Sequence, residues 1–249
     1  MCVTALVLAG GAGTRLAPLK LDVPKPMLPL VGRPLLAWLV DLLLLHAEKV
    51  VICAGSKASL LMSGISCGER VFLFADNEAG TAAAVVDAAQ AHPAPQFLIC
   101  NADTVNDLDL LGFMHFHLHR GGHATIALTR RPEVQNAGAF AVGRNGRVLR
   151  SFEDGQIGRP PHLGAAWHGA STGVFAISQH ALEAAGTAAI SIERHLLPRL
   201  IPSDKGLLAF DNGQRMSLDI GTPERLKIMN EMEQRIIEVY RGRTARSRN

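Results

Sequence analysis

Apolar and polar positions follow two alternating patterns along the first half of the chain. Short apolar runs with the length of a buried strand lie at 3–8, 49–53, 71–75 and 96–100. Segments with the length and pattern of helices lie between and after them, at 33–46, 56–63, 80–91 and 108–120. Strands that alternate with helices are typical of a parallel sheet covered on both faces.

The pattern changes after residue 123. Strand-like segments separated by turns follow at 124–130, 138–142, 146–152 and 171–177, and helices are expected at 179–185, 192–200 and 223–240. The last helix has a strong start, because Thr222 can cap it, Pro223 suits its first position and Glu224 its first turn. We expect one three-layer α/β/α domain over residues 1–240, with a mostly parallel, mixed central sheet and a small mixed β region.

Composition narrows the class of protein. Apolar residues make up 48% of the 249 residues and aromatic ones only 5%, so aliphatic side chains must build the core. The net charge of +3 is smaller than the charge of the four arginines in residues 241–249, which we expect to form a basic flexible tail. Without these four arginines the net charge of the chain is close to zero, which argues against nucleic-acid binding.

The sequence shows neither a membrane-spanning stretch nor the close cysteine spacing of a redox motif. No stretch approaches the roughly 20 apolar residues of a membrane span, so we expect no membrane association. The four cysteines, Cys2, Cys53, Cys67 and Cys100, show no CxxC spacing. They fit reduced thiols in a cytoplasmic protein.

A glycine-rich loop follows the first strand and carries the main chemical signal. Gly10, Gly11 and Gly13 precede Thr14 and Arg15, and Lys25 stands further on between two prolines. Glycine allows backbone N–H groups to approach phosphates, and the two cations add the charge that a polyphosphate needs. The loop is neither a dinucleotide fingerprint, because Leu16 stands where the third glycine belongs, nor a Walker loop.

Two acids follow apolar strands elsewhere. Asp103 comes after the strand at 96–100, and Asp219 ends the short apolar run that begins at residue 217. Ligands of parallel sheets bind beyond the carboxyl ends of the strands, where carboxylates can hold Mg²⁺. Each acid alone would also suit a helix cap or a turn. Together with the basic loop they predict metal-assisted chemistry on phosphates.

These segments resemble the sugar-1-phosphate nucleotidyltransferases, the enzymes that make nucleoside-diphosphate sugars. The resemblance covers roughly residues 3–230 and rests on LAGGAGTRL, PKPMLPLVGRPLL, EAGTAAAV, NADT, STGVF, SIERHLLPRL and LDIGTPE, in this order. Within the family the chain is most similar to the D-glycero-D-manno-heptose 1-phosphate guanylyltransferase group. The resemblance implies the family's Rossmann-like fold and transfer of a nucleotidyl group from an NTP to a sugar 1-phosphate, with release of pyrophosphate.

The resemblance also implies roles for individual residues. The nucleotide would contact Leu8, Ala9, Gly10, Gly11, Gly13, Thr14, Arg15, Gly80, Thr81 and Asp103. The sugar side would be lined by Gly138, Glu153, Gly173 and Glu193. The catalytic group would be Arg15, Lys25, Asp103 and Asp219, with Asp103 and Asp219 holding Mg²⁺.

Three positions depart from the family pattern. Ala102 and Asp154 replace a usual glycine and a usual lysine, and Ser171-Thr172-Gly173 replaces Asn-Ala-Gly. Asp154 puts a negative charge where the family has a positive one that contacts the sugar phosphate. A shifted sugar substrate is therefore a further expectation.

Several alternatives stay open. GTP with the heptose phosphate is the first expectation, and ATP, mannose 1-phosphate or glucose 1-phosphate are the others. A sensor that binds nucleotide sugars without turnover is the alternative from another class. The helix at 223–240 could pair with a second copy to form a homodimer, or pack on its own domain.

A histidine cluster could also suggest a metal site. His115 and His119 are spaced by four residues on an expected helix, and His117 and His123 lie close to them in sequence. The segment is amphipathic and lacks an accompanying glutamate motif, so we expect a helix surface there rather than zinc.

Overall fold

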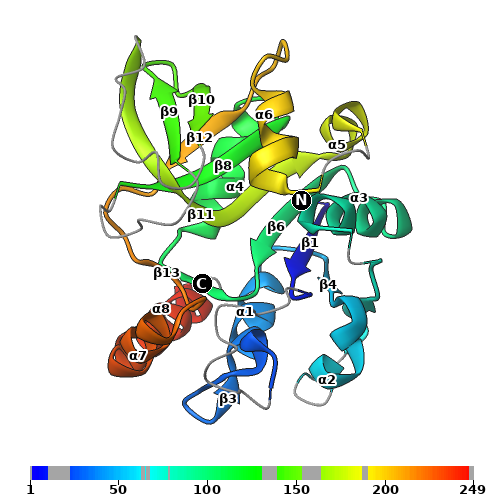
Figure 1. Cartoon of the computed structure of the whole chain (residues 1–249), viewed down its shortest axis with the longest axis vertical. Helices are drawn as coiled ribbons and strands as arrows, with labels where there is room; N and C mark the ends of the chain where they lie inside the picture. The colour runs from blue at the N-terminus through cyan, green and yellow to red at the C-terminus, as the bar shows by residue number, and fades with distance from the viewer. Residues whose placement is uncertain are drawn as a thin grey trace.

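Figure 1 shows the computed structural model of the chain, in which helices lie around a central sheet. The structure describes residues 2–10, 23–62, 65, 68–77, 79–130, 139–152, 164–186 and 190–246. Gly11, Gly13, Thr14 and Arg15 of the glycine loop, and Gly138, Glu153 and Asp154 of the expected sugar side, lie outside these residues.

The strands confirm most of the expected pattern. They are β1 (Val3–Leu8), β2 (Pro29–Leu30), β3 (Arg33–Pro34), β4 (Lys49–Cys53), β5 (Val71–Phe74), β6 (Gln96–Asn101), β7 (Thr104–Asn106), β8 (Ala124–Thr129), β9 (Ala139–Gly143), β10 (Val148–Phe152), β11 (Ala165–Ser178), β12 (Leu208–Asp211) and β13 (Ser217–Asp219).

The helices also lie close to their expected places. They are η2 (Lys25–Met27), α1 (Leu35–Leu43), η3 (Gly55–Lys57), α2 (Ala58–Met62), α3 (Thr81–Ala91), α4 (Leu110–His119), α5 (Gln179–Ala185), the π-helical turn η4 (Ile192–Leu196), α6 (Leu197–Leu200), α7 (Pro223–Glu231) and α8 (Glu233–Arg246). The side chains of Asp109, Ser178 and Thr222 cap α4, α5 and α7. Such caps satisfy backbone N–H groups that the first turn leaves without a helical partner.

The central sheet is mixed, with a parallel half and an antiparallel half. Its strand order is β10-β9-β11-β6-β1-β4-β5, and β8 joins through β11 and β12 through β8. Strands β6, β1, β4 and β5 run parallel. Strand β11 pairs antiparallel with β6, β8 and β9, so it links the two halves. The parallel half brings four strand ends to one edge.

Helices cover both faces of the sheet and create two cores. Alternate residues of β1 separate them: Val3, Ala5 and Val7 pack with α1, α4 and α8, whereas Leu6 packs with α3, α5 and α6. This side-chain alternation is the two-residue period of a strand. Figure 1 shows α1 and α8 together on one side of β1 and α3 on the other. The expected three-layer α/β/α architecture is confirmed.

Some boundaries differ from the expectation for tertiary reasons. The helix expected at 33–46 begins at Leu35, because residues 33–34 pair with β2 as strand β3. Strand β11 is longer than residues 171–177, since it must reach both β6 and β9. Strand β12 was not expected, and it pairs parallel with β8.

The helix expected over 223–240 is wrong in its continuity, because it is two helices that meet at Met232. The second helix is fixed by contacts to the other elements. The carboxylate of Glu233 accepts a hydrogen bond from the backbone N–H of Val31, and the ring of Tyr240 lies 6.2 Å from that of Trp38. Helix α8 continues to Arg246, into the segment expected to be a tail. Across the described residues, no helix is both long enough and apolar enough to cross a membrane.

Candidate active site

A cleft of about 570 Å³ lies at the carboxyl ends of the four parallel strands. Backbone bonds hold these ends together, since Ala9 donates to the Cys53 carbonyl at 2.9 Å and Ala102 to the Leu8 carbonyl at 3.0 Å. The described residues that line the cleft are Leu8, Ala9, Gly10, Lys25, Pro26, Cys53, Ser56, Asp76, Gly80, Thr81, Ala84, Asn101 and Asp103. The structure thus brings together every described residue expected at the nucleotide.

Lys25 and Asp103 form an ion pair at one end of the cleft. The Lys25 Nζ lies 3.6 Å from Asp103 Oδ2, and the lysine side chain is only 13% exposed. Pro24 and Pro26 fix the backbone on both sides of Lys25, which opens the short turn η2. The lysine is therefore held in place beside the carboxylate and largely shielded from water.

Asp219 lies next to Asp103 although the two are far apart in sequence. Strand β13 pairs antiparallel with β7, which places Asp219 opposite Thr104, and Ile220 donates to the Asp103 carbonyl at 2.9 Å. The expectation that these two acids meet is confirmed at the level of the backbone.

Arg225 is a further charged residue beside Asp219, and it was not among the residues predicted for the site. Its Nη1 lies 2.8 Å from Asp219 Oδ2, and both side chains are mostly buried. Arg225 stands in the first turn of α7, where its N–H donates to the Thr222 hydroxyl at 3.4 Å. Its pairing with Asp219 depends on the turn between β13 and α7, so residue type alone did not signal it.

These carboxylates fit a cation that takes part of its coordination from the substrate. Among the described residues no group of three or more His, Cys, Asp or Glu side chains could hold a metal ion. Mg²⁺ is commonly held by one or two carboxylates, with phosphate oxygens and waters completing its octahedron. The pair Asp103 and Asp219 matches that donor set.

Gly80 and Thr81 connect the nucleotide side of the cleft to the segment before Glu193. Gly80 has φ of +117°, and a Cβ there would lie 2.2 Å from the Ile190 carbonyl oxygen, so only glycine fits. The Thr81 hydroxyl accepts a hydrogen bond from Ile192 N at 3.1 Å. Glu193 follows in η4, and its contact with a sugar stays a prediction.

Gly173 lies in an irregular part of β11, beside the end of β6. Its φ is +71°, and a Cβ would meet Asn101 Nδ2 at 2.6 Å. Ser171 Oγ accepts from Gly173 N at 3.1 Å, and Thr172 Oγ1 donates to the Ala127 carbonyl at 3.0 Å. The two hydroxyls that replace the family's Asn-Ala therefore brace this turn, and both residues are buried.

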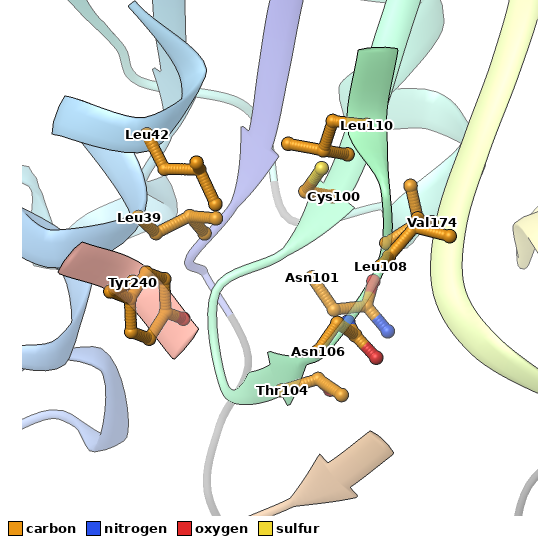
Figure 2. Close-up of a pocket in the computed structure, with 10 residues that line it drawn as sticks. All are labelled: Leu39, Leu42, Cys100, Asn101, Thr104, Asn106, Leu108, Leu110, Val174 and Tyr240. Atoms are coloured by element: carbon orange, nitrogen blue, oxygen red, sulfur yellow. The ribbon is translucent and has the colours of Figure 1, made fainter. Parts of the chain in front are cut away.

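A second, much smaller cavity of about 20 Å³ lies behind the turn between β6 and β7, which carries Asp103 (Figure 2). Figure 2 shows Leu39 and Leu42 of α1 and Tyr240 of α8 on one side, and Thr104 and Asn106 of β7 on the other. A cavity of this size holds about one water molecule. This small cavity is part of the packing beneath the turn between β6 and β7. The larger cleft is therefore the place where a substrate fits.

Six residues of the cleft lining were not selected from the sequence as site residues: Pro26, Cys53, Ser56, Asp76, Ala84 and Asn101. Ser56 and Asp76 follow β4 and β5, and Cys53 ends β4. The rule that selected Asp103, a polar residue just after a buried strand, also applies to Asp76. Burial raises the pKa of Cys53 to about 12, so its thiol stays protonated and is a poor nucleophile.

The helix surface expected around the four histidines differs at His117, which faces the core. His117 is fully buried, and its two ring nitrogens lie 2.8 Å from Thr125 Oγ1 and 2.9 Å from Gln96 Oε1. The Gln96 amide nitrogen donates to the Gly122 carbonyl, so its oxygen must accept from His117 Nε2. The neutral histidine thus has both nitrogens satisfied and stabilises the contact between α4, β6 and β8.

This arrangement predicts that the fold weakens in mild acid. Burial, with a smaller effect of His123, lowers the pKa of His117 from 6.5 to about 4. Below pH 6.5 the unfolded chain takes up a proton that the folded chain refuses until about pH 4, so stability falls as pH falls through this window. Urea unfolding should show a loss of about 2 kcal/mol between pH 7 and pH 5 from this group. The variant His117→Gln should lack this component, and an equal pH dependence in both proteins would contradict the assignment.

The chain matches a known protein family and is similar to several curated proteins. The family model described as Nucleotidyl transferase matches residues 4–233. A mannose-1-phosphate guanyltransferase beta-B of Xenopus laevis is 28% identical over 230 residues, covering 88% of this chain and 61% of that protein. The mannose-1-phosphate guanylyltransferase catalytic subunit beta of Danio rerio is 29% identical, with the same shares covered. The chain thus spans about three fifths of the length of these relatives.

Solved structures share the fold. HddC from Yersinia pseudotuberculosis, in a complex with GMP-PN, superposes with a TM-score of 0.73 at 24% identity, covering 92% of this chain and 98% of that one. The inositol-1-phosphate CTP transferase from T. maritima gives a TM-score of 0.71 at 18% identity, with 94% and 96% covered. At these identities the likeness concerns the fold.

Proposed function

The chain belongs to the nucleotidyl transferase family, and on this premise we propose that it transfers the nucleotidyl group of an NTP to a sugar 1-phosphate. An oxygen of the sugar phosphate would attack the α-phosphorus of the NTP. One new P–O bond forms, the bond from the α-phosphorus to the bridging β-phosphate oxygen breaks, and pyrophosphate leaves. The observation that carries this proposal is the Lys25–Asp103 pair beside Asp219, at the carboxyl ends of the parallel strands.

The residues would act by position and charge. The attacking phosphate oxygen is already anionic at neutral pH, so the site needs no general base. Lys25 would neutralise the α-phosphate as negative charge redistributes during attack. Arg15, which lies outside the described residues, would act on the β- and γ-phosphates. Holding the two phosphates in line supplies much of the remaining acceleration.

Mg²⁺ would be the cofactor, held by the carboxylates of Asp103 and Asp219. When bound, it would supply positive charge to the phosphate oxygens during transfer. Arg225, paired to Asp219 at 2.8 Å, would keep that carboxylate oriented. The Lys25 Nζ, 3.6 Å from Asp103 Oδ2, would lie between this metal-binding carboxylate and the reacting phosphate.

GTP is the proposed nucleotide and D-glycero-D-manno-heptose 1-phosphate the proposed acceptor. Support comes from the sequence resemblance and from the two relatives described above, which are named as mannose-1-phosphate guanylyltransferases. The same names support mannose 1-phosphate as a second acceptor. The two sugars share the manno configuration, so one acceptor site can be tested with both.

Pyrophosphate release with Mg²⁺ tests the proposal directly. Each of the four NTPs is combined with heptose, mannose or glucose 1-phosphate, and the sugar nucleotide is identified by mass. Release with GTP and a manno-configured acceptor is the expected result. Tight binding of a sugar nucleotide with no release from any combination would contradict the enzymatic proposal and favour a sensor.

A further inference from the structure

The hairpin that joins β2 to β3 holds a valine in an unusual backbone conformation. Val31 and Gly32 form its two-residue turn, with φ of +50° and +70°. Positive φ at both central positions is typical of a type I′ turn, which favours asparagine or glycine at its first position. Among the described residues Val31 is the only one other than glycine with a positive φ. A β-branched residue in this conformation is strained, so its surroundings must hold it there.

Two side chains hold the peptide group between Leu30 and Val31 from its opposite ends. The carbonyl oxygen accepts a hydrogen bond from Trp38 Nε1 on α1 at 3.0 Å, and the N–H donates to the Glu233 carboxylate at the start of α8. Val31 can return to negative φ only if this peptide plane rotates, because φ is the rotation about the bond that joins the plane to the Val31 Cα. Such a rotation would break both hydrogen bonds. The bond to the ionised carboxylate is the stronger kind of the two.

The hairpin and Lys25 belong to one stiff segment of the chain. Each proline in this segment fixes its own φ and so limits how the segment can bend. These prolines are Pro24, Pro26, Pro29 and Pro34. Leu28 N donates to the Lys25 carbonyl at 3.1 Å, and Leu35 N donates to the Leu28 carbonyl at 3.0 Å. The base of the hairpin is thus bonded directly to the turn that carries Lys25, and a rearrangement at Val31 should reach the lysine.

We infer that Glu233 is a positioning residue for Lys25, because it holds the strained turn at Val31 and through it the lysine beside Asp103. Glu233 itself is outside the described lining of the cleft. The Lys25 side chain is only 13% exposed, and its Nζ lies 3.6 Å from Asp103 Oδ2, so a small shift would change its surroundings. A displacement of about 1 Å can lower a rate about 100-fold. The inference rests on the proposed function, in which Lys25 acts on the α-phosphate.

The test combines Glu233→Ala with a change that removes the strain at Val31. Glu233→Ala should lower kcat roughly 10-fold or more and change the KM for GTP much less, since Lys25 is proposed to act on the transition state. Glycine adopts positive φ without strain, so the double variant Val31→Gly/Glu233→Ala should recover most of the lost kcat. Val31→Gly alone should keep the kcat of the natural protein. Glu233→Gln retains an oxygen that can accept from Val31 N, so it should also keep most of the activity.

Chemical labelling of lysine tests the placement of Lys25 without any turnover. Acetic anhydride acylates lysine amines, and mass spectrometry of peptides follows the reaction at Lys25. The labelling rate should rise several-fold in Glu233→Ala, because local opening exposes the amine, and return to the natural rate in the double variant. Lys227, which is 79% exposed on α7, is the internal reference and should react equally in every protein.

Glu238→Ala is the matched control, because Glu238 is an exposed glutamate on the same helix α8. It should change neither kcat nor the labelling rate of Lys25. The inference is overturned by an equal loss in Glu238→Ala, by natural kcat and labelling in Glu233→Ala, or by a loss that Val31→Gly does not restore. If no protein releases pyrophosphate but Lys25 labelling follows the expected order, the positioning role stands and only the proposed function fails.

Discussion

Asp103→Asn is expected to lower turnover about 1000-fold at saturating GTP and sugar 1-phosphate, and Asp219→Asn should do nearly the same. Each change keeps the size of the side chain but removes the negative charge that would hold Mg²⁺. The two residues are neighbours through the β7–β13 pairing, so either loss weakens the same cation site. Both variants should also need much more Mg²⁺ to reach half of their remaining activity.

The measurement is initial-rate pyrophosphate release over a Mg²⁺ titration. Asp41→Asn is a suitable control, because Asp41 is half exposed on α1 and pairs with Arg33 at 2.7 Å, away from the cleft. It should keep the activity of the natural protein, since an exposed ion pair contributes little to stability. Full turnover with an unchanged Mg²⁺ requirement in both Asp103→Asn and Asp219→Asn would remove the cation from the proposal.

Lys25→Ala is expected to reduce kcat by roughly 100- to 1000-fold, with a smaller effect on the KM for GTP. The reason is that charge at the α-phosphate builds up during attack, so a fixed cation stabilises the transition state more than the bound substrate. The two prolines beside Lys25 hold the backbone, so the fold should not depend on the side chain. The melting temperature should change little.

Lys227→Ala provides the matched control for this variant. Lys227 is 79% exposed on α7 and pairs with Glu231 one helical turn further on. Its removal tests whether general positive charge matters, as opposed to charge at the cleft. Should Lys25→Ala raise the KM for GTP and leave kcat unchanged, the lysine would bind substrate without acting on the transition state.

The sequence predicted well which described residues gather at one edge of the sheet. Gly10 and Asp103 follow the runs at 3–8 and 96–100, and the carboxyl ends of parallel strands in one sheet bring such residues together. The second acid, Asp219, was also found, although its partner strand β7 was not. The histidines near residue 117 show the opposite case, because spacing alone could not reveal that His117 is buried between Gln96 and Thr125.

Other features depended on contacts between distant segments. Arg225 could not be linked to Asp219 before the turn into α7 was known. The break between α7 and α8 has no glycine or proline at Met232 to announce it. It reflects the docking of Glu233 on Val31 and of Tyr240 beside Trp38.

The sequence by itself determined the alternation of strands and helices and the capped start of α7, and it predicts that the glycine loop binds phosphates. These are local properties, set by side-chain periodicity and by the conformations that glycine and proline allow. Tertiary structure alone decided which strand ends face one another, and hence that Asp103 and Asp219 are neighbours. The reason is that strand order is fixed by burial of both faces of the sheet, a property of the whole chain.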